Sequence, residues 1–307
     1  MRHTALLLAF LAAPLSAQWP EVRRDTALEH RLEALASEMD GVAGFYVRHL
    51  ETGRGATIRA DELFPTASVI KVPILGATFD RLERGELRYD TVITWADSLR
   101  YGDDDGLVNQ LADSAALPLS FATLMMITTS DNAAALLLQA LAGGGERINQ
   151  WLADNGFDST RVNSRTPGRS DNWEQYGWGQ TSPREIAELV VRMREGTLVS
   201  PAASEAMYRH LTRIYWNGVA LAELPPWVQA ASKQGMVRRS RAEVVLVNAP
   251  SGDYVFAVMT RDQNDTSYDR GNQGYELIRK TSRLLWQTFE PDHPWRPAEG
   301  AERYMPE

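Results

Sequence analysis

The sequence predicts an α+β fold in which a single antiparallel sheet is built from both ends of the chain. Two strand-like segments lie near the start and three lie near the end. The long region between them shows mostly helical spacing of apolar residues, interrupted by Gly, Asp and Pro. The simplest arrangement is a five-stranded antiparallel sheet flanked by the terminal helices, with the middle region as an all-helical lobe. A ligand site is then expected in the cleft between the two lobes.

The first elements come from the N-terminal part of the chain. Residues 26–39 place apolar side chains on one helical face. Two strands follow at 41–50 and 55–60, joined by the turn Glu51-Thr52-Gly53-Arg54. A helical pattern begins near Ser68 and continues, with loops, to about residue 222.

The closing part of the chain returns to strand patterns. Its predicted elements are strands at 227–232, 242–248 and 254–260, a helix at 274–289 and a loose tail at 290–307. We therefore expect one catalytic domain over 18–289. Its sheet lobe comprises 26–62 and 223–289, and its helical lobe comprises 63–222.

The first 17 residues are typical of an export signal. Arg2 supplies a positive start, residues 5–14 are apolar but too short to span a bilayer, and Leu15-Ser16-Ala17 offers small residues for cleavage. No later segment is long and apolar enough for a membrane span. A periplasmic or secreted protein is therefore expected.

Composition excludes several classes of function. The chain has no cysteine, so its stability rests on its core rather than on disulfides. A net charge of −8 without a block of basic residues argues against nucleic acid and anionic membranes as partners. The five histidines show no metal-ligand spacing. We expect no metal, no cofactor and a monomer.

Ser68 and Lys71 form the first candidate catalytic pair. The chain has only three lysines, and Lys71 and Lys233 both lie in short motifs with a serine. A lysine that loses its proton can act as a base, whereas arginine stays charged. Lys71 follows Ser68 by three residues, so on a helix the two side chains share a face. A serine hydroxyl needs such a base within about 3 Å. Taken alone the motif is weak, because Ser68 is also explained as a helix cap.

Two further motifs carry suitable chemistry. Ser130 offers a hydroxyl that could pass on a proton, and Asn132 offers an amide for a substrate carbonyl or for Lys71. As local structure, Thr129-Ser130-Asp131-Asn132 is equally typical of a helix N-cap. Lys233-Gln234-Gly235 follows a predicted strand, where glycine would let the backbone approach a ligand.

In this order and spacing, the three motifs resemble those of class A β-lactamases and penicillin-binding proteins, which carry S-x-x-K, then S-D-N, then K-x-G. The resemblance covers nearly the whole chain after residue 17, and the predicted element order agrees with it. Three further segments share it: Phe64-Pro65-Thr66-Ala67, Leu124-Met125-Met126-Ile127-Thr128 and Thr181-Ser182-Pro183-Arg184.

The resemblance implies a role for each motif residue. Ser68 would be acylated by a β-lactam or a related amide, and Lys71 would help to activate it. Ser130 would relay a proton to the leaving nitrogen with the help of Lys233. Asn132 would orient the amide of the substrate.

The resemblance also implies binding groups. The backbone N–H groups of Ser68 and Met236 would form an oxyanion hole, with each donor worth about 3–4 kcal/mol. Lys233, with Gln234 and Gly235 beside it, would meet the substrate carboxylate. One of three nearby arginines would assist: Arg238, Arg239 or Arg241. The alternative for these arginines is a solvated strand edge.

The sequence departs from the family pattern at two positions. The glutamate that clears the acyl-enzyme in class A β-lactamases falls on Thr166 when counted back from Pro183, and no E-x-x-L-N signature is present. Glu174 and Asp171 are the nearby carboxylates, and Glu174 is the candidate replacement base. Gln234 stands where the family has Thr or Ser, so substrate preference is expected to differ.

These departures shape the functional prediction. Without a carboxylate beside it, Lys71 reaches its neutral form more easily, so acylation of Ser68 is retained while deacylation becomes the weak step. The leading hypothesis is a β-lactamase-like serine hydrolase with slow turnover. One alternative is a peptidoglycan D,D-peptidase or an esterase that uses the same serine. Another is a non-catalytic protein that binds cell-wall peptide, although the complete set of motif residues argues against it.

Overall fold

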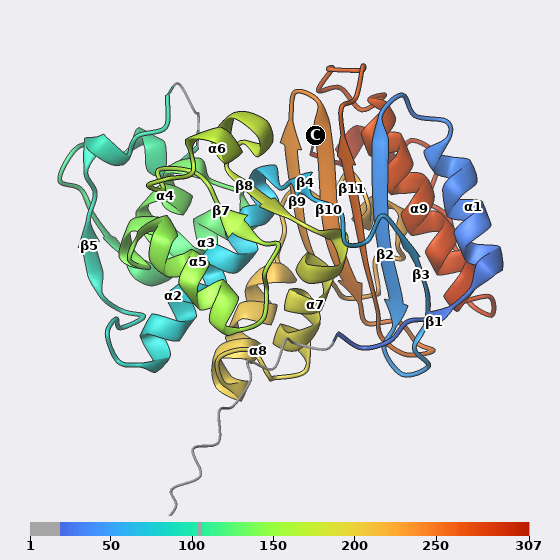
Figure 1. Cartoon of the computed structure of the whole chain (residues 1–307), viewed down its shortest axis with the longest axis horizontal. Helices are drawn as coiled ribbons and strands as arrows, with labels where there is room; N and C mark the ends of the chain where they lie inside the picture. The colour runs from blue at the N-terminus through green and yellow to red at the C-terminus, as the bar shows by residue number, and fades with distance from the viewer. Residues whose placement is uncertain (1–18, 103–105, 307) are drawn as a thin grey trace, which may run out of the picture.

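A computed structural model describes residues 19–102 and 106–306. The predicted export signal at 1–17 lies outside these residues. Figure 1 shows a helical lobe beside a sheet, with two helices covering the opposite face of the sheet. The predicted α+β architecture is confirmed.

The main sheet has six strands in the order β1-β3-β2-β11-β10-β9. Its strands are β1 (Arg23–Arg24), β2 (Val42–His49), β3 (Arg54–Ile58), β9 (Ala230–Val237), β10 (Ser240–Val247) and β11 (Tyr254–Arg261). Five of them pair antiparallel and come from both ends of the chain, as predicted. The short β1 adds a sixth strand that runs parallel to β3.

Strand β9 is longer than the predicted strand at 227–232. It continues to Val237 because Lys233 and Gly235 pair with Val244 and Ala242 of β10. The lysine motif therefore lies inside the edge strand of the sheet, not beyond its end. A lysine and a glycine weaken the strand pattern in the sequence, and pairing with β10 overrides that local signal.

Helices α1 (Thr26–Ala36) and α9 (Gln273–Phe289) pack on the face of the sheet away from the helical lobe (Figure 1). The side chain of Asp25 caps α1 by accepting a hydrogen bond from the backbone N–H of Leu28 at 3.0 Å. Leu28 and Leu32 of α1 and Leu285 of α9 pack with inward-facing residues of the sheet in one core.

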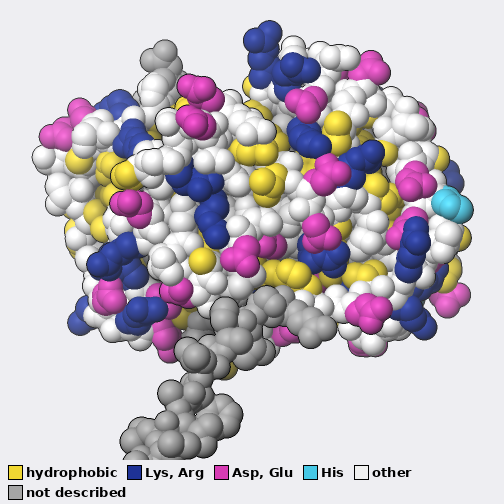
Figure 2. All heavy atoms as spheres, in the orientation of Figure 1, with side chains coloured by type: hydrophobic (Ala, Val, Ile, Leu, Met, Phe, Trp, Pro, Cys, Tyr) yellow, Lys and Arg dark blue, Asp and Glu magenta, His cyan; other side chains and the backbone are white. Residues whose placement is uncertain are grey.

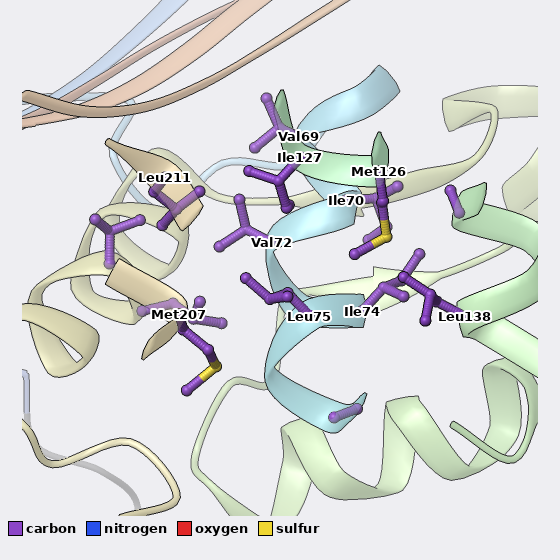
Figure 3. Packing of buried hydrophobic residues seen from close by; sticks show 14 of the residues in the cluster. Val69, Ile70, Val72, Ile74, Leu75, Met126, Ile127, Leu138, Met207 and Leu211 are labelled. Carbon is purple, nitrogen blue, oxygen red and sulfur yellow. The ribbon is translucent and has the colours of Figure 1, made fainter. Parts of the chain in front are cut away.

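The helical lobe is built around a second core. Its helices are α2 (Lys71–Glu83), α3 (Leu119–Thr128), α4 (Asn132–Leu141), α5 (Gly144–Asp154), α6 (Ser170–Tyr176), α7 (Pro183–Arg194) and α8 (Pro201–Leu211). Figure 3 shows Val72, Ile74 and Leu75 of α2 pointing into this core among side chains from neighbouring helices, which include Ile127 and Met207. This packing fixes the position of α2, which directly follows the turn that carries Ser68.

The lobe is not entirely helical, contrary to the prediction. It also contains β4 (Phe64–Pro65), β5 (Val92–Thr94), β6 (Ala116–Pro118), β7 (Arg161–Val162) and β8 (Gly179–Thr181). These strands form two small sheets, β4-β8-β7 and β5-β6. Each strand is only two or three residues long. Such segments are too short to show the alternation that identifies a strand in sequence.

A buried ionic cluster fastens α7 to the sheet. Glu188 of α7 accepts hydrogen bonds from Tyr46 Oη at 2.5 Å and from the guanidinium of Arg48 at 3.0 and 2.9 Å. All three residues are buried, and Tyr46 and Arg48 both belong to β2. A buried charge that loses its partner costs far more than the intact pair contributes.

The segment after α9 was predicted to be a loose tail, but it packs against the body of the protein. Trp286 Nε1 donates a hydrogen bond to the backbone carbonyl of His293 at 2.8 Å, and Trp295 packs against the core beneath α9. A short 3₁₀ helix, η5 (Ala301–Tyr304), follows. Pro306 then lies near Gly218, in the loop that follows α8. The aromatic anchors explain the order of this segment, which shows no helical or strand periodicity.

The surface shows charges of both signs. In Figure 2, Lys and Arg side chains alternate with Asp and Glu side chains over the visible face. Among the described residues, no helix combines the length and apolar character that crossing a membrane requires.

The Glu188 cluster yields a stability prediction. Replacing Glu188 with Ala leaves Arg48 buried without its carboxylate, so we expect the free energy of unfolding to fall by about 3–5 kcal/mol. Urea unfolding followed by circular dichroism measures it. The matched control is Glu205→Ala, which removes an exposed i,i+4 pair with Arg209 and should cost under about 0.5 kcal/mol. Equal effects of the two changes would contradict the assignment.

Candidate active site

Ser68 lies in a 3₁₀ turn, η1 (Ala67–Ile70), that leads directly into α2. The preceding Ala67 has a φ of 44°, in the left-handed region that costs energy for a residue with a side chain. Strand β9 passes close by at Gly235. A Cβ at that position would lie 2.4 Å from the carbonyl oxygen of Thr66 and 2.8 Å from the nitrogen of Ser68. Glycine is therefore required for this approach to the turn at Ser68, whereas the motif predicted an approach to a ligand.

Lys71 is fully buried and joins the predicted residues. Its Nζ lies 2.9 Å from Ser68 Oγ, 2.7 Å from Asn132 Oδ1 and 3.1 Å from Ser130 Oγ. It also donates to the backbone carbonyl of Ser130 at 2.5 Å. The ring of Trp178 lies 5.8 Å from the same nitrogen. A neutral Lys71 in this position can take the proton of Ser68.

Ser130 occupies a tight turn between α3 and α4. Its φ is 62°, which is unusual for a non-glycine residue and typical of strained functional sites. The next residue, Asp131, caps α4 by accepting from the N–H of Ala134 at 2.8 Å, and it also accepts from the N–H of Val108. The N-cap predicted here is therefore Asp131. This capping leaves Ser130 and Asn132 free to face Lys71.

Lys233 approaches Ser130 from the sheet. Its Nζ donates to Ser130 Oγ at 3.0 Å and to the carbonyl of Gln234 at 2.8 Å. Burial lowers the pKa of Lys233 to about 7, and the nearby carboxyl of Glu243 opposes this shift. Ser130 is therefore in hydrogen-bonding contact with both lysines.

Glu243 of β10 is a buried carboxyl that the sequence analysis missed. It accepts hydrogen bonds from Ser232 Oγ at 2.6 Å and from the backbone N–H of Ala220 at 3.0 Å. Burial raises its pKa to about 7, although these hydrogen bonds and Lys233 favour the charged form. A glutamate inside the otherwise apolar strand 242–247 was the available signal.

The pocket beside the two serines is lined by residues from both lobes and from the C-terminal region: Ser68, Ser130, Trp216, Gly218, Val219, Gln234, Gly235, Met236, Tyr268, Arg270, Tyr275, Arg279 and Pro306. The predicted Gln234, Gly235 and Met236 are among them. Arg270 and Arg279 were not predicted, because they lie far along the chain from the motifs. No Asp or Glu belongs to this described lining.

The structure places the predicted arginines elsewhere. Arg238 is exposed in the turn between β9 and β10, outside the pocket lining. Arg241 is buried, and its guanidinium donates to the carbonyls of Val237 and Ser240 at 2.6 and 2.8 Å. Its Cζ lies 4.9 and 4.7 Å from the ring centres of Tyr268 and Tyr275, which line the pocket. Arg241 therefore supports the pocket wall from behind.

The loop to which the resemblance assigns a glutamate carries Thr166 at that position. Thr166 donates its hydroxyl to the carbonyl of Ser164 at 3.0 Å and packs tightly against Gly145, where a Cβ would lie 1.8 Å from Thr166 Oγ1. Glu174 is exposed on α6 and does not belong to the pocket lining described above. Trp178, another residue that the sequence analysis gave no role, stands over Lys71.

These contacts define a class of enzyme. A serine hydroxyl beside a buried lysine, with a second serine between two lysines, is the arrangement of a serine hydrolase that works through an acyl-enzyme. Within 19–102 and 106–306, no cluster of three or more His, Asp or Glu side chains is arranged to hold a metal ion.

The chain belongs to the beta-lactamase enzyme family, whose model matches residues 27–289. A β-lactamase of Rhodobacter capsulatus is 25% identical over 283 residues, which are 89% of this chain and 95% of that protein. A β-lactamase of Streptomyces fradiae is 32% identical over 216 residues, which are 66% of this chain and 67% of that protein. The superfamily of class A β-lactamases and penicillin-binding proteins is thereby confirmed.

Solved structures agree with this assignment. The structure of PBP-A is 28% identical and aligns with a TM-score of 0.79 over 89% of this chain and 100% of that one. A point mutant of PBP-A, which matches equally well, was solved as an acyl-enzyme complex with penicillin G. A β-lactamase of Sphaerobacter thermophilus shares the fold at 22% identity, with a TM-score of 0.77 over 88% of this chain and all of that one.

The Lys233–Glu243 pair yields a pH prediction. Charged Lys233 donates more strongly to Ser130 and attracts an anionic substrate, so acylation of Ser68 should slow as the pH rises through about 7. Glu243→Gln removes a negative charge that favours charged Lys233. The decline should therefore begin at a lower pH in this variant.

The pH dependence of the acylation rate constant measures this shift. Ser232→Ala should shift the decline in the same direction as Glu243→Gln, because it removes a hydrogen bond that favours the charged carboxyl of Glu243. A decline at the same pH in wild type and Glu243→Gln would show that Glu243 does not influence Lys233.

Proposed function

We propose that this protein opens the β-lactam amide through an acyl-enzyme on Ser68 and releases the product slowly. The observation that carries the proposal is the position of Lys71 Nζ, 2.9 Å from Ser68 Oγ. The acyl-enzyme that a PBP-A mutant forms with penicillin G supports the choice of substrate class.

The first step is attack by Ser68. Neutral Lys71 accepts the proton of the hydroxyl while Oγ adds to the carbonyl carbon of the lactam. The resulting oxyanion is stabilised by the backbone N–H groups of Ser68 and Met236, which lie on the turn and the strand that meet at Gly235. Fixed donors of this kind require no reorganisation during the reaction.

The second step is cleavage of the C–N bond. Ser130 donates its proton to the leaving nitrogen and regains one from Lys71, since its Oγ lies 3.1 Å from Lys71 Nζ. Charged Lys233 holds Ser130 in place at 3.0 Å and attracts the substrate carboxylate. Arg270, which lines the pocket, adds a second positive charge.

Deacylation lacks an evident base. The hydroxyl of Thr166 is not basic and is bound to the carbonyl of Ser164. The described lining of the pocket includes no carboxylate that could activate water. Slow release of the acyl group follows from this.

A second candidate function is a peptidoglycan D,D-peptidase or an esterase. The similarity to PBP-A at 28% identity favours it, together with the same lack of a carboxylate in the pocket lining. A panel of β-lactams, D-Ala-D-Ala peptides and small esters separates the two candidates. Turnover of the peptide or ester alone would favour the second.

The acyl-enzyme is directly testable by intact-protein mass spectrometry. Mixing with benzylpenicillin should add the mass of one intact β-lactam to the wild type, because ring opening loses no atoms. Ser68→Ala should remain unlabelled, since it lacks the nucleophile. We expect hydrolysis below about 1 s⁻¹, the lower end of typical enzyme turnover. A rapidly disappearing adduct would contradict slow release, and a chain that never becomes labelled would contradict acylation.

The exposed position of Glu174 leads to another prediction. A general base has to reach the attacking water, and the side chain of Glu174 is exposed on α6. We therefore expect Glu174→Gln to leave the decay rate of the adduct unchanged in a chromogenic β-lactam assay. Its matched control is Glu195→Gln, an exposed residue at the C-terminus of α7. A decay rate that falls only in Glu174→Gln would identify Glu174 as the replacement base.

A further inference from the structure

The C-terminal segment reaches the pocket that contains the reactive serine. The match to the family model ends at residue 289, where α9 also ends. The chain then turns back, and Pro306 lines the same pocket as Ser68 and Ser130. This part of the pocket wall therefore comes from a segment outside the matched region.

The C-terminal segment contacts the loop after α8 at Gly218. A Cβ built on Gly218 would lie 2.7 Å from the carbonyl oxygen of Pro306 and 3.6 Å from Cβ of Met305. Arg270 donates to the carbonyl of Gly218 at 3.4 Å. The loop, Arg270 and the C-terminal segment thus meet at one place, and the absence of a side chain on Gly218 allows the close approach.

The contact at Gly218 lies on the side of the pocket where the leaving group of the substrate is bound. Trp216 donates to the carbonyl of Thr129, next to Ser130, at 2.7 Å. At the other end of the same loop, Ala220 donates to Glu243, the carboxyl that influences Lys233. The loop therefore runs beside Ser130 and Lys233. Because Ser130 protonates the leaving nitrogen, groups attached to that nitrogen extend toward this loop.

The pocket is small for its proposed substrate. Its cavity volume is about 70 Å³, whereas pockets for drug-sized ligands usually enclose about 300–1,000 Å³. Pro306 lies where a large substituent on the leaving-group side would extend, so such a substrate fits only if Pro306 moves.

We propose that residues 301–306 form a strap over the leaving-group side of the pocket and select against substrates with bulky substituents there. The inference rests on the proposed acylation of Ser68 by β-lactams and adds a determinant of specificity to it. The strap acts by steric exclusion, and the reacting groups are the same with or without it.

The test compares two cephems that share one acyl side chain. One carries a methyl group on carbon 3, and the other carries a large aromatic group that is not expelled during the reaction. The rate constant for labelling Ser68 is measured by mass spectrometry in the wild type and in a variant truncated after Gly300. Truncation should speed labelling by the bulky cephem about tenfold or more, the scale of a steric filter in an enzyme pocket. Labelling by the methyl cephem should change little.

The matched control for truncation is Tyr304→Ala. Tyr304 belongs to η5, is 89% exposed and does not line the pocket, so its loss should leave both rates unchanged. Equal acceleration of both cephems by truncation, or no acceleration of either, would overturn the strap.

A second variant covers the case in which the truncated chain does not fold. Pro306→Gly keeps the full chain and removes the ring of Pro306, which lines the pocket. This change should speed labelling by the bulky cephem, with the methyl cephem little affected. Identical rates for the bulky cephem in Pro306→Gly and in the wild type would again overturn the strap.

Failure of the proposed function gives a different result. In that case the methyl cephem labels neither the wild type nor any variant, and the inference falls with the function on which it rests. If only the strap proposal is wrong, the methyl cephem still labels Ser68, but truncation does not selectively speed labelling by the bulky cephem.

Discussion

Two buried lysine side chains share a single serine hydroxyl, and the geometry of the site depends on this arrangement. Ser130 Oγ lies 3.1 Å from Lys71 Nζ and 3.0 Å from Lys233 Nζ. Burial lowers the pKa of Lys233 to about 7, and the carboxyl of Glu243 opposes this shift. The poorly solvated interior thus reduces the cost of a neutral lysine at this site.

The two lysines belong to different lobes, so the site exists only when the lobes are docked. Lys71 begins the central helix of the helical lobe, and Lys233 lies in the edge strand of the sheet. Close packing at Gly235 and the buried Glu188 cluster fix the two parts relative to each other. Ala67 and Ser130, on the helical side of this junction, both have left-handed backbone, a strained conformation that the surrounding structure can hold.

Much of this site could be predicted from the sequence because its chemistry lies in short motifs. Ser68 and Lys71 are placed by helical spacing, and Ser130 and Asn132 flank a capping aspartate, so local geometry determines each pair. The relative position of the motifs came from the resemblance to a family. Residues outside the motifs could not be found in the same way, because contacts between distant segments leave no local pattern. Arg270 and Pro306 are the clearest cases.

The same reasoning explains the errors about Arg241 and β9. The resemblance implied that Arg238, Arg239 or Arg241 assists Lys233, but neighbouring carbonyls already satisfy much of the guanidinium of Arg241. The length of β9 is determined by pairing with β10, which no local signal reports. Local sequence patterns predicted which segments form helices and strands. Contacts between distant segments determine the residues at which these helices and strands begin and end.

The position of β9 at the edge of the sheet has a consequence for solubility. An unpaired strand edge is a template for association with other chains, and proteins usually protect it with charges, bulges or a covering segment. Here η1 covers β9 near Gly235, at the point where catalysis takes place. The contact between the lobes thus shields a surface that would otherwise favour aggregation, so a loss of lobe docking would endanger the solubility of the protein as well as its chemistry.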